Sequence, residues 1–241
     1  MKITFLGTRG YIESSTRLHK RHTSTLFSYH NTHILIDRGI DWLGQPYPKS
    51  LRAIFITHAH PDHAWGLQSG APCEVYASRE SWELMKDFTL ITQRQVVIPR
   101  KKIKIGEFII EPFFEEHSIR CPALGYRITA GKHIIFYSGD VVFIPQYHEA
   151  LQSVQLYIGD GASLIRPIIR KTKDGKLFGH APISTQLTWC KKENVPRAIF
   201  THCGSQIVEA DGRSMGAKVR QLGKMHGIIA SIAHDGMELI L

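Results

Sequence analysis

Short runs of apolar and β-branched residues recur along the first half of the chain, and polar turn residues separate them. Runs of about four to eight such residues between turn signals are typical of β-strands. Turns at His30-Asn31 and Ala130-Gly131 are short enough to join strands as hairpins. The strands expected here are Lys2–Leu6, Ser24–Ser28, His33–Ile36, Ala53–Thr57, Phe108–Phe114, Gly125–Thr129 and His133–Tyr137.

Helical spacing of apolar positions becomes more frequent further along the chain. Ser78–Phe88 has this spacing, with Ser78 as a suitable N-cap. A helix-like stretch also runs through Leu67. The second half is expected to contain strands Leu156–Ile158, Ala198–Thr201, Ile228–Ile232 and Met237–Ile240, a long polar loop to Phe178, and helices from Ser184 to Lys192 and ending near Met225.

The order of these elements indicates an α/β fold. Strands come first and strand–helix alternation follows, twice, which is the pattern of two sheets packed face to face with helices outside. No linker, low-complexity tract or short repeat interrupts residues 1–241. We therefore expect a single domain.

The composition adds a strong positive charge to this picture. The chain has 30 Lys and Arg against 21 Asp and Glu, which gives a net charge of +9. This excess favours an anionic partner, such as a phosphate ester, a nucleic acid or an anionic membrane surface, although surplus cations also simply keep a protein in solution.

The spacing of the cysteines and the hydropathy of the chain indicate the cellular compartment of the protein. The four cysteines are widely spaced and form no C-x-x-C pair, which argues against a disulfide framework or a structural zinc knuckle. The apolar stretch in MKITFLGTRG is too short for a signal peptide, and no segment reaches the roughly 18 apolar residues of a membrane span. We expect a cytoplasmic protein that does not bind membranes, and the sequence leaves a homodimer open.

Three histidines and an aspartate lie within one short segment directly after a predicted strand. Residues two apart in an extended segment point to the same side, so His58 and His60 are placed to bind one metal ion. Pro61 then begins a helix, whose tighter backbone turns Asp62 and His63 toward a second ion. These ligands suit zinc and tolerate iron or manganese. A surface cluster that is His-rich by chance would not explain the position directly after a β-branched strand.

Four ligands cannot complete two metal sites, so others are expected at the ends of strands, where a sheet carries side chains to one rim. His117 follows a strand, Asp140 ends HIIFYSGD and His202 ends AIFTH. A single histidine after a strand is as often structural as functional, but together these residues complete a set. We expect two divalent metal ions, one held by His58, His60 and His117 and the other by Asp62, His63 and His202, with Asp140 as the bridge.

The motifs T-H-A-H-P-D-H, S-G-D and T-H, together with His117, resemble the metal motifs of the metallo-β-lactamase superfamily. The resemblance extends from GTRG near the start to the last predicted strand. It implies an αβ/βα four-layer sandwich, with two mixed sheets flanked by helices and a dinuclear site on one edge. β-Lactamases of the commonest class carry cysteine in place of Asp140, so the resemblance implies a hydrolase whose substrate is not an antibiotic.

The second half resembles the phosphodiesterase branch of that superfamily, which includes the tRNA 3′-processing endonuclease Z and the phosphonate-pathway cyclic phosphodiesterase. GTRG resembles the opening of those enzymes. Asp160 in YIGDGAS lies where the endonuclease has an acidic segment, and Gly179-His180 resembles its G-H-S histidine. The resemblance therefore implies an anionic substrate, either RNA or a small or cyclic phosphodiester.

Two features depart from that branch. His117 and Asp140 are joined by a plain predicted hairpin, which leaves no room for the exosite arm with which the endonuclease holds tRNA. No cysteine precedes Cys73, so the cysteine-rich zinc site of the phosphonate-pathway enzyme has no counterpart. The identity of the substrate stays open.

The chemistry of a two-metal site predicts the roles of the remaining residues. Two ions about 3.5–4 Å apart activate a bridging hydroxide and stabilise the attacking and leaving oxygens of a phosphodiester. Asp62 is expected to orient that hydroxide. His180 is expected to be the general acid for the leaving alkoxide, with Asp160 holding its ring. The alternative is that His180 binds only backbone at a helix entry.

Basic residues precede His180 and are expected to steer an anion toward the metals, although a solvated loop would have the same composition. Two other functions stay open. The same site suits a carboxylic ester, lactone or thioester hydrolase. Outside the enzymes, the alternative is a basic nucleic-acid-binding protein with a structural metal, although structural zinc sites are usually closed. The candidate substrate-binding residues are Arg166, Arg170, Lys171 and, in the N-terminal loop, His22.

Overall fold

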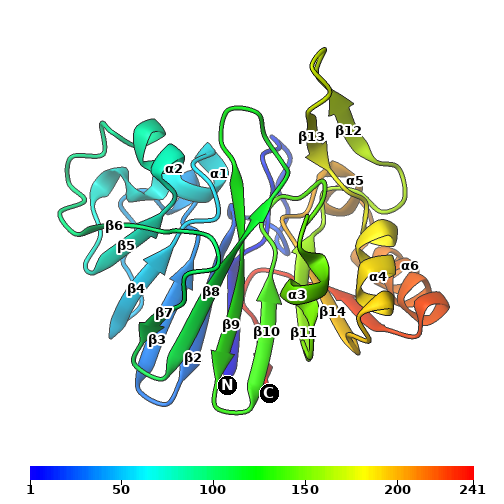
Figure 1. Cartoon of the computed structure of the whole chain (residues 1–241). Coiled ribbons are helices and arrows are strands. Elements are labelled where there is room, and N and C mark those ends of the chain that lie inside the picture. Colours follow the sequence, from blue (N-terminus) through cyan, green and yellow to red (C-terminus); the bar gives the residue numbers. More distant parts are fainter.

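Two seven-stranded sheets pack face to face in the computed structural model, which describes residues 1–241 (Figure 1). Each sheet mixes parallel and antiparallel pairs. The first sheet contains, in spatial order, β16 (Met237–Ile240), β1 (Lys2–Gly7), β2 (Ser24–Tyr29), β3 (Thr32–Ile36), β4 (Leu51–Phe55), β5 (Glu74–Ala77) and β6 (Arg94–Val96). The second contains β15 (Ile229–Ile232), β14 (Arg197–Thr201), β11 (Leu156–Asp160), β10 (His133–Tyr137), β9 (Ala123–Ala130), β8 (Phe108–Glu115) and β7 (Ile103–Ile105).

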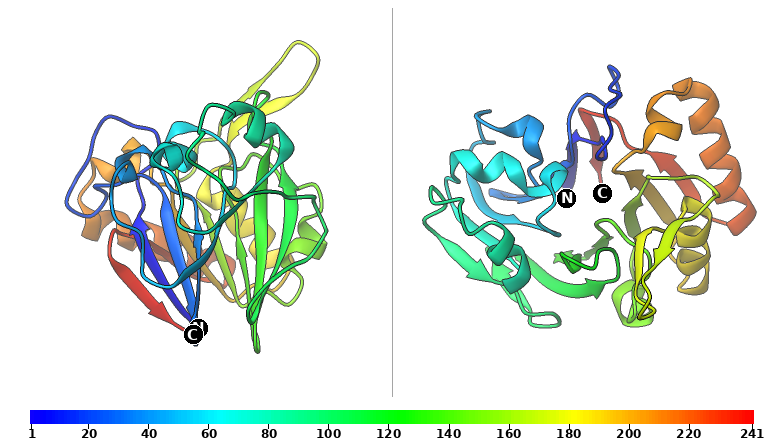
Figure 2. Two further views of the ribbon diagram at one scale, coloured as in Figure 1. Left: turned by 90° about the vertical axis from the view of Figure 1, so that its left-hand side faces the viewer. Right: turned by 90° about the horizontal axis from the view of Figure 1, so that it is seen from above.

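Helices flank the pair of sheets on both sides (Figures 1 and 2). The predicted sandwich of two mixed sheets between helices is confirmed. None of the helices combines the length and the apolar character that crossing a bilayer requires. The helical segments are η1 (Ile40–Trp42), α1 (Pro61–Ala64), η2 (Trp65–Ser69), α2 (Arg79–Leu84), α3 (Tyr147–Leu151), α4 (Ile183–Lys192), α5 (Ser205–Val208) and α6 (Gly212–His226).

Apolar side chains fill the space between the sheets because alternate residues of each strand point inward. Phe5, Phe27 and Phe55 of the first sheet share one buried cluster with Tyr126 and Ile158 of the second. Two further clusters contain the buried residues of α2 on one side and of α4 and α6 on the other. The sheets therefore form a rigid base for the segments that leave their edges.

The carboxyl ends of four strands of the second sheet meet at one rim. β10 is parallel to β11 and β11 to β14, while β8 and β10 are both antiparallel to β9. β8, β10, β11 and β14 thus run in the same direction. The segment that follows β4 in the first sheet reaches the same rim, at the top of Figure 1.

The prediction of a long polar loop up to Phe178 is partly wrong. Ile168–Lys171 (β12) and Leu177–His180 (β13) form an antiparallel hairpin that rises above the rim (Figure 1). Its turn contains Asp174-Gly175, a common hairpin signal, and Gly175 has a φ of 91°. β5, β6 and β7 are not among the predicted strands because runs of three or four residues are too short to show alternation.

The predicted helix cap at Ser78 is confirmed. Ser78 Oγ accepts a hydrogen bond from Ser81 N at 3.0 Å, which satisfies one of the free amides of the first turn. The helix ends at Leu84, earlier than the predicted Phe88.

Candidate metal centre and active site

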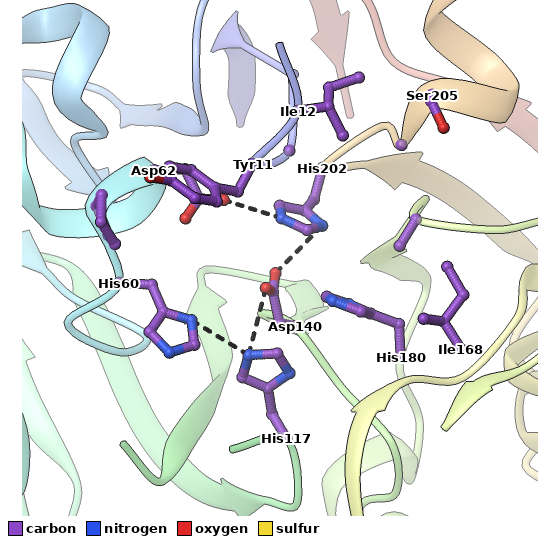
Figure 3. A pocket seen from close by; sticks show the side chains of 14 residues that line it. Tyr11, Ile12, His60, Asp62, His117, Asp140, Ile168, His180, His202 and Ser205 are labelled. Atoms are coloured by element: carbon purple, nitrogen blue, oxygen red, sulfur yellow. Dashed lines mark hydrogen bonds and ion pairs between the residues drawn. The ribbon is translucent and has the colours of Figure 1, made fainter. Parts of the chain in front are cut away.

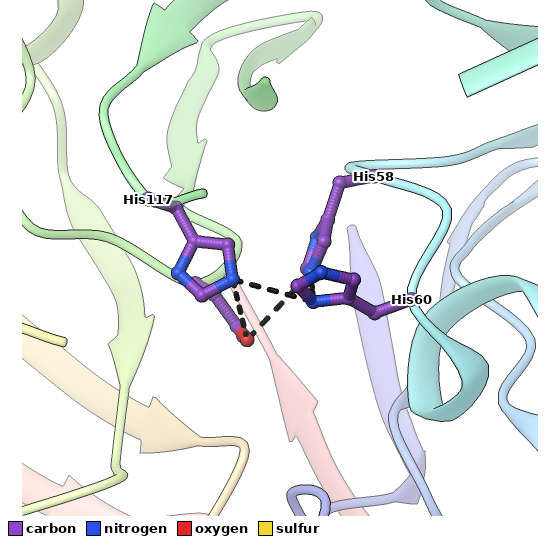
Figure 4. A group of neighbouring side chains, drawn as sticks. His58, His60 and His117 are labelled. Carbon is purple, nitrogen blue, oxygen red and sulfur yellow. Dashed lines mark hydrogen bonds and ion pairs between the residues drawn. The ribbon is translucent and has the colours of Figure 1, made fainter. Parts of the chain in front are cut away.

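Four ligand atoms from the two sheets converge at the rim (Figure 4). His58 Nε2 lies 2.9 Å from His60 Nδ1, which lies 3.4 Å from His117 Nε2. Asp140 Oδ2 is 3.5 Å from His117 Nε2 and 3.7 Å from His58 Nε2. Ligands of a tetrahedral zinc ion with bonds of about 2.0–2.1 Å lie about 3.3 Å apart. The four atoms therefore fit one ion.

A second group of ligand atoms lies beside the first and shares Asp140 with it (Figure 3). Asp62 Oδ2 is 3.0 Å from His202 Nε2 and 3.3 Å from His63 Nε2, and Asp140 Oδ1 is 3.1 Å from His63 Nε2. Asp140 thus presents one oxygen to each group, as a bridging ligand does.

Two atoms of the second group lack hydrogen-bond partners. His63 Nε2 and Asp140 Oδ1 are buried, and neither makes a hydrogen bond. Buried polar atoms are nearly always paired in native proteins, and an ion is one cause of an apparent exception. The buried His/Asp clusters are therefore consistent with a dinuclear metal centre.

Neighbouring groups fix which ring nitrogen of two histidines faces the centre. His63 Nδ1 donates to Asp37 Oδ2 at 2.7 Å, and Asp37 Oδ1 also accepts from Thr57 N. His117 Nδ1 donates to Gly179 O at 2.8 Å. In each ring Nε2 is left for the metal, and such outer partners hold ligands in orientation. Asp37 directly follows β3, a position after a strand like those of the predicted ligands, but it is not among the predicted residues.

Burial and the carboxylates shift the histidine pKa values in opposite directions. Burial lowers the pKa of His117 to about 4 and that of His58 well below its usual value. Burial also acts to lower the pKa of His202, but Asp140, Asp160 and Asp62 together raise it to about 10. The metal-free centre thus carries a proton on His202 that a bound metal would displace.

Glu115 is a buried residue that supports the loop carrying Asp140. Ser138 Oγ donates to Glu115 Oε1 at 2.8 Å, and Gly139 N donates to Glu115 Oε2 at 3.1 Å. Burial raises the pKa of Glu115 well above its usual value. A Cβ at Gly125 would lie 2.4 Å from Glu115 Oε1, so the glycine makes room for the carboxyl group.

We expect Glu115→Ala to weaken both the fold and the centre. It leaves the buried Gly139 amide unpaired, which lowers the free energy of unfolding by about 1–3 kcal/mol. Loss of an outer support also lowers metal affinity by about 10–100-fold. Denaturant unfolding and metal titration measure the two effects. Glu115→Gln is the control, because its amide can still bond to both partners; equal losses in the two variants would contradict the role.

His180 and Asp160 form a pair next to the centre. Asp160 Oδ2 accepts from His180 Nδ1 at 2.7 Å and from Val141 N at 3.2 Å. Asp160 Oδ1 accepts from Ala162 N at 2.8 Å and from His202 Nδ1 at 3.2 Å. Both carboxylate oxygens are therefore already used by protein donors, although Asp160 also lies in a third His/Asp group with His180.

The hydrogen bond to Asp160 favours the protonated form of the His180 ring. Burial acts to lower the pKa of His180, but Asp160 raises it above its usual value. His180 Nε2 has no hydrogen-bond partner, and the ring lines the pocket that contains the metal ligands (Figure 3). The ring is thus placed to give a proton to a bound molecule.

The pocket above the centre has a volume of about 460 Å³. Tyr11, Ile12, Ile168 and Ser205 line its walls together with the candidate ligands (Figure 3). No Lys or Arg lines it. These wall residues lie in the N-terminal loop, on the hairpin and at the start of α5, and nothing in their local sequence marks them as part of a site.

The predicted substrate-binding residues lie outside this pocket. His22 is buried, and its Nδ1 lies 2.7 Å from Asp41 Oδ2. Arg166, Arg170 and Lys171 are exposed, the last two on β12. Asp41, 19 residues away from His22 along the chain, is the partner that sequence spacing does not reveal.

Comparison with known proteins identifies one family and several solved structures of similar fold. The profile of the Beta-lactamase superfamily domain matches residues 32–203. No curated protein matches the chain in sequence. Similar solved structures include Zn²⁺-bound PqqB from Methylobacterium extorquens (TM-score 0.76, 15% identity, 100% of each chain), a diphosphatase of the PhnP family (0.71, 18%, 100% of this chain and 97% of that one) and the short form of human tRNase Z (0.69, 19%, 100% and 99%). At these identities the likeness is one of fold.

Proposed function

The chain belongs to the β-lactamase superfamily and is a metal-dependent hydrolase of that fold, and from this premise we propose that its substrate is a phosphodiester. The observation that carries the proposal is the His180–Asp160 pair beside the metal centre. Departure of an alkoxide from phosphorus needs a proton, and a histidine held by a carboxylate is suited to supply it.

The charges in the pocket favour a singly charged anion. Two divalent ions would leave a surplus of one positive charge at the centre once the carboxylates of Asp62 and Asp140 and the attacking hydroxide are counted. A neutral ester does not use this surplus. A phosphomonoester carries a second negative charge, and no Lys or Arg lines the pocket to meet it. A phosphodiester, with one negative charge, fits best.

The residues of the centre have distinct proposed roles. Zinc ions, with iron or manganese as alternatives, would supply Lewis acidity to the phosphoryl oxygens and to the attacking water. Asp62 would hold the second ion and orient the attacking water. His180 Nε2 donates a proton to the leaving oxygen, while Asp160 accepts from Nδ1 and keeps the ring in place.

The openness of the centre argues against a purely structural metal. Structural zinc sites are closed by four protein ligands. Here five candidate ligands, among them His60, Asp62 and His202, line an open pocket. Two of the similar folds are, by their names, a diphosphatase and a tRNase, which supports a phosphorus ester as the substrate class.

A panel of substrates with the same leaving group tests this proposal. Relative to the uncatalysed rates, turnover of bis(4-nitrophenyl) phosphate should exceed that of 4-nitrophenyl phosphate and 4-nitrophenyl acetate by roughly tenfold or more, a scale typical of substrate discrimination. Initial rates of nitrophenolate release, with and without EDTA, provide the measurement. A clear preference for lactones or thioesters would instead assign the protein to the carboxylic ester, lactone and thioester hydrolases.

A further inference from the structure

The β12–β13 hairpin divides its side chains between two faces. Ile168 pairs with His180, and Arg170 pairs with Phe178. Directly opposed residues of an antiparallel pair share a face, as do residues two apart along a strand. Ile168 and His180 both line the active-site pocket. Arg170 and Phe178 therefore lie on this same face, which we call the pocket-side face, farther from the metals.

The opposite face of the hairpin has different neighbours. It carries Ile169, Lys171 and Leu177, by the same alternation. Leu177 lines a separate cavity of about 310 Å³ together with Phe114 and Ile119. The neighbouring cations Arg170 and Lys171 thus belong to different faces, and only Arg170 continues the wall of the active site.

The base of the hairpin is fixed to the metal centre. Gly179 N donates to His117 O at 2.8 Å, and His117 Nδ1 donates to Gly179 O at 2.8 Å. Gly179 has a φ of 118°, and a Cβ there would lie 1.9 Å from Ile168 O, so only glycine fits. The pocket-side face is therefore held at a defined place relative to the candidate ligand His117.

The hairpin is strongly basic, and its two cations on β12 are free. Neither Arg170 nor Lys171 makes an ion pair, whereas Lys176 Nζ lies 3.9 Å from Asp174 Oδ2. Phe178 is half-buried, and Ile168 is 48% exposed. Residues 166–176 contain one acidic residue, Asp174, and five cations: Arg166, Arg170, Lys171, Lys173 and Lys176.

An aromatic ring and a cation lie side by side one step beyond His180. Two residues along a strand advance about 6.8 Å, so Arg170 and Phe178 are about that far past Ile168 and His180. Proteins that bind single-stranded nucleic acids combine cations for the phosphates with aromatic rings on which bases stack. The positive charge and the half-buried ring together match this chemistry.

We propose that the pocket-side face binds a single-stranded nucleic acid that extends from the scissile phosphodiester on its leaving-group side. This inference rests on the proposed phosphodiesterase function. His180 protonates the leaving oxygen, so the nucleotide that carries this oxygen continues along the hairpin. Its base stacks on Phe178, and the next phosphate pairs with Arg170.

Binding of a labelled oligonucleotide to the metal-loaded protein tests the pocket-side face. The probe is a fluorescein-labelled single-stranded RNA of about eight nucleotides, with phosphorothioate linkages that slow cleavage, and the readout is fluorescence anisotropy. Arg170→Glu and Phe178→Ala should each raise Kd by about tenfold, the scale of one lost stacking or phosphate contact. Lys171→Glu is the matched control, with the same charge change on the opposite face. It should raise Kd by about two- to threefold, and added salt should remove this effect.

Several results would overturn the inference. If Arg170→Glu and Lys171→Glu weakened RNA binding equally, the hairpin would contribute only general electrostatic attraction. Wild-type protein that does not bind the probe, or that binds a duplex as tightly, would also overturn it. Metal content and thermal unfolding check that each variant is folded. Turnover of bis(4-nitrophenyl) phosphate reports separately on the proposed function. If the wild type does not hydrolyse this diester, the proposed function is wrong, whatever the binding experiment shows.

Discussion

We expect the wild type to bind about two metal ions per chain and an Asp140→Ala variant to lose both. One oxygen of Asp140 faces the group of His58, His60 and His117, and the other lies 3.1 Å from His63 Nε2. Its removal therefore takes a ligand from each ion. The affinity loss should exceed the 10–100-fold that removal of an outer partner costs. Metal analysis after dialysis and turnover of a chromogenic diester measure the loss.

Asp160→Asn provides the matched control for this experiment. Asp160 belongs to a His/Asp group with Asp140, His180 and His202, but its two oxygens are occupied by protein donors. The variant should keep two ions, with affinity lowered by no more than about 10–100-fold. A wild type with one tightly held ion, together with an unaffected Asp140→Ala variant, would contradict the assignment of a bridging residue.

Replacing His180 with alanine should slow the enzyme only where the leaving group needs a proton. A nitrophenolate departs unaided, but an alkoxide such as a ribose hydroxyl does not. Removal of a general acid typically costs a factor of about 10²–10⁴. His180→Ala should therefore be slow by about this factor on a diester with an alkoxide leaving group and nearly normal on a nitrophenyl diester. Steady-state rates on the two substrates provide the measurement.

Two outcomes would assign His180 a different role. Loss of metal in His180→Ala would make this residue a ligand or a ligand support, as its place in a His/Asp group with Asp140 and His202 would allow. An equal slowdown on both leaving groups would make it a residue that binds substrate without transferring a proton.

The parts of the fold that could be predicted from the sequence are those whose pattern is local. The last residues of β4 and β14 are buried on both faces and mostly apolar, so the ends of these strands are visible from the polar ligands that follow, His58 after β4 and His202 after β14. β12 is exposed along its length, and β13 is exposed or half-buried. Their only local signal is the turn at Asp174-Gly175, because no buried face imposes alternation on them.

The supporting residues of the site could not be predicted because their partners are distant in sequence. Glu115 holds the loop before Asp140 through hydrogen bonds 23 and 24 residues away. Asp37 holds His63 across 26 residues. The assignment of Arg170 and Lys171 to different faces likewise depends on the pairing of β12 with β13, which composition does not reveal.

The metal ligands come from both sheets, and this couples the centre to the packing of the whole sandwich. His58, His60, Asp62 and His63 follow a strand of the first sheet, while His117, Asp140 and His202 follow strands of the second. The ions bind fully only when the sheets are docked, so at about 1,000 times Kd they add about 4.1 kcal/mol to the free energy of unfolding. Thermodynamic linkage is reciprocal. A cavity opened between the sheets at Phe27, in the interior of β2, which carries no candidate ligand, would therefore lower the metal affinity of the chain.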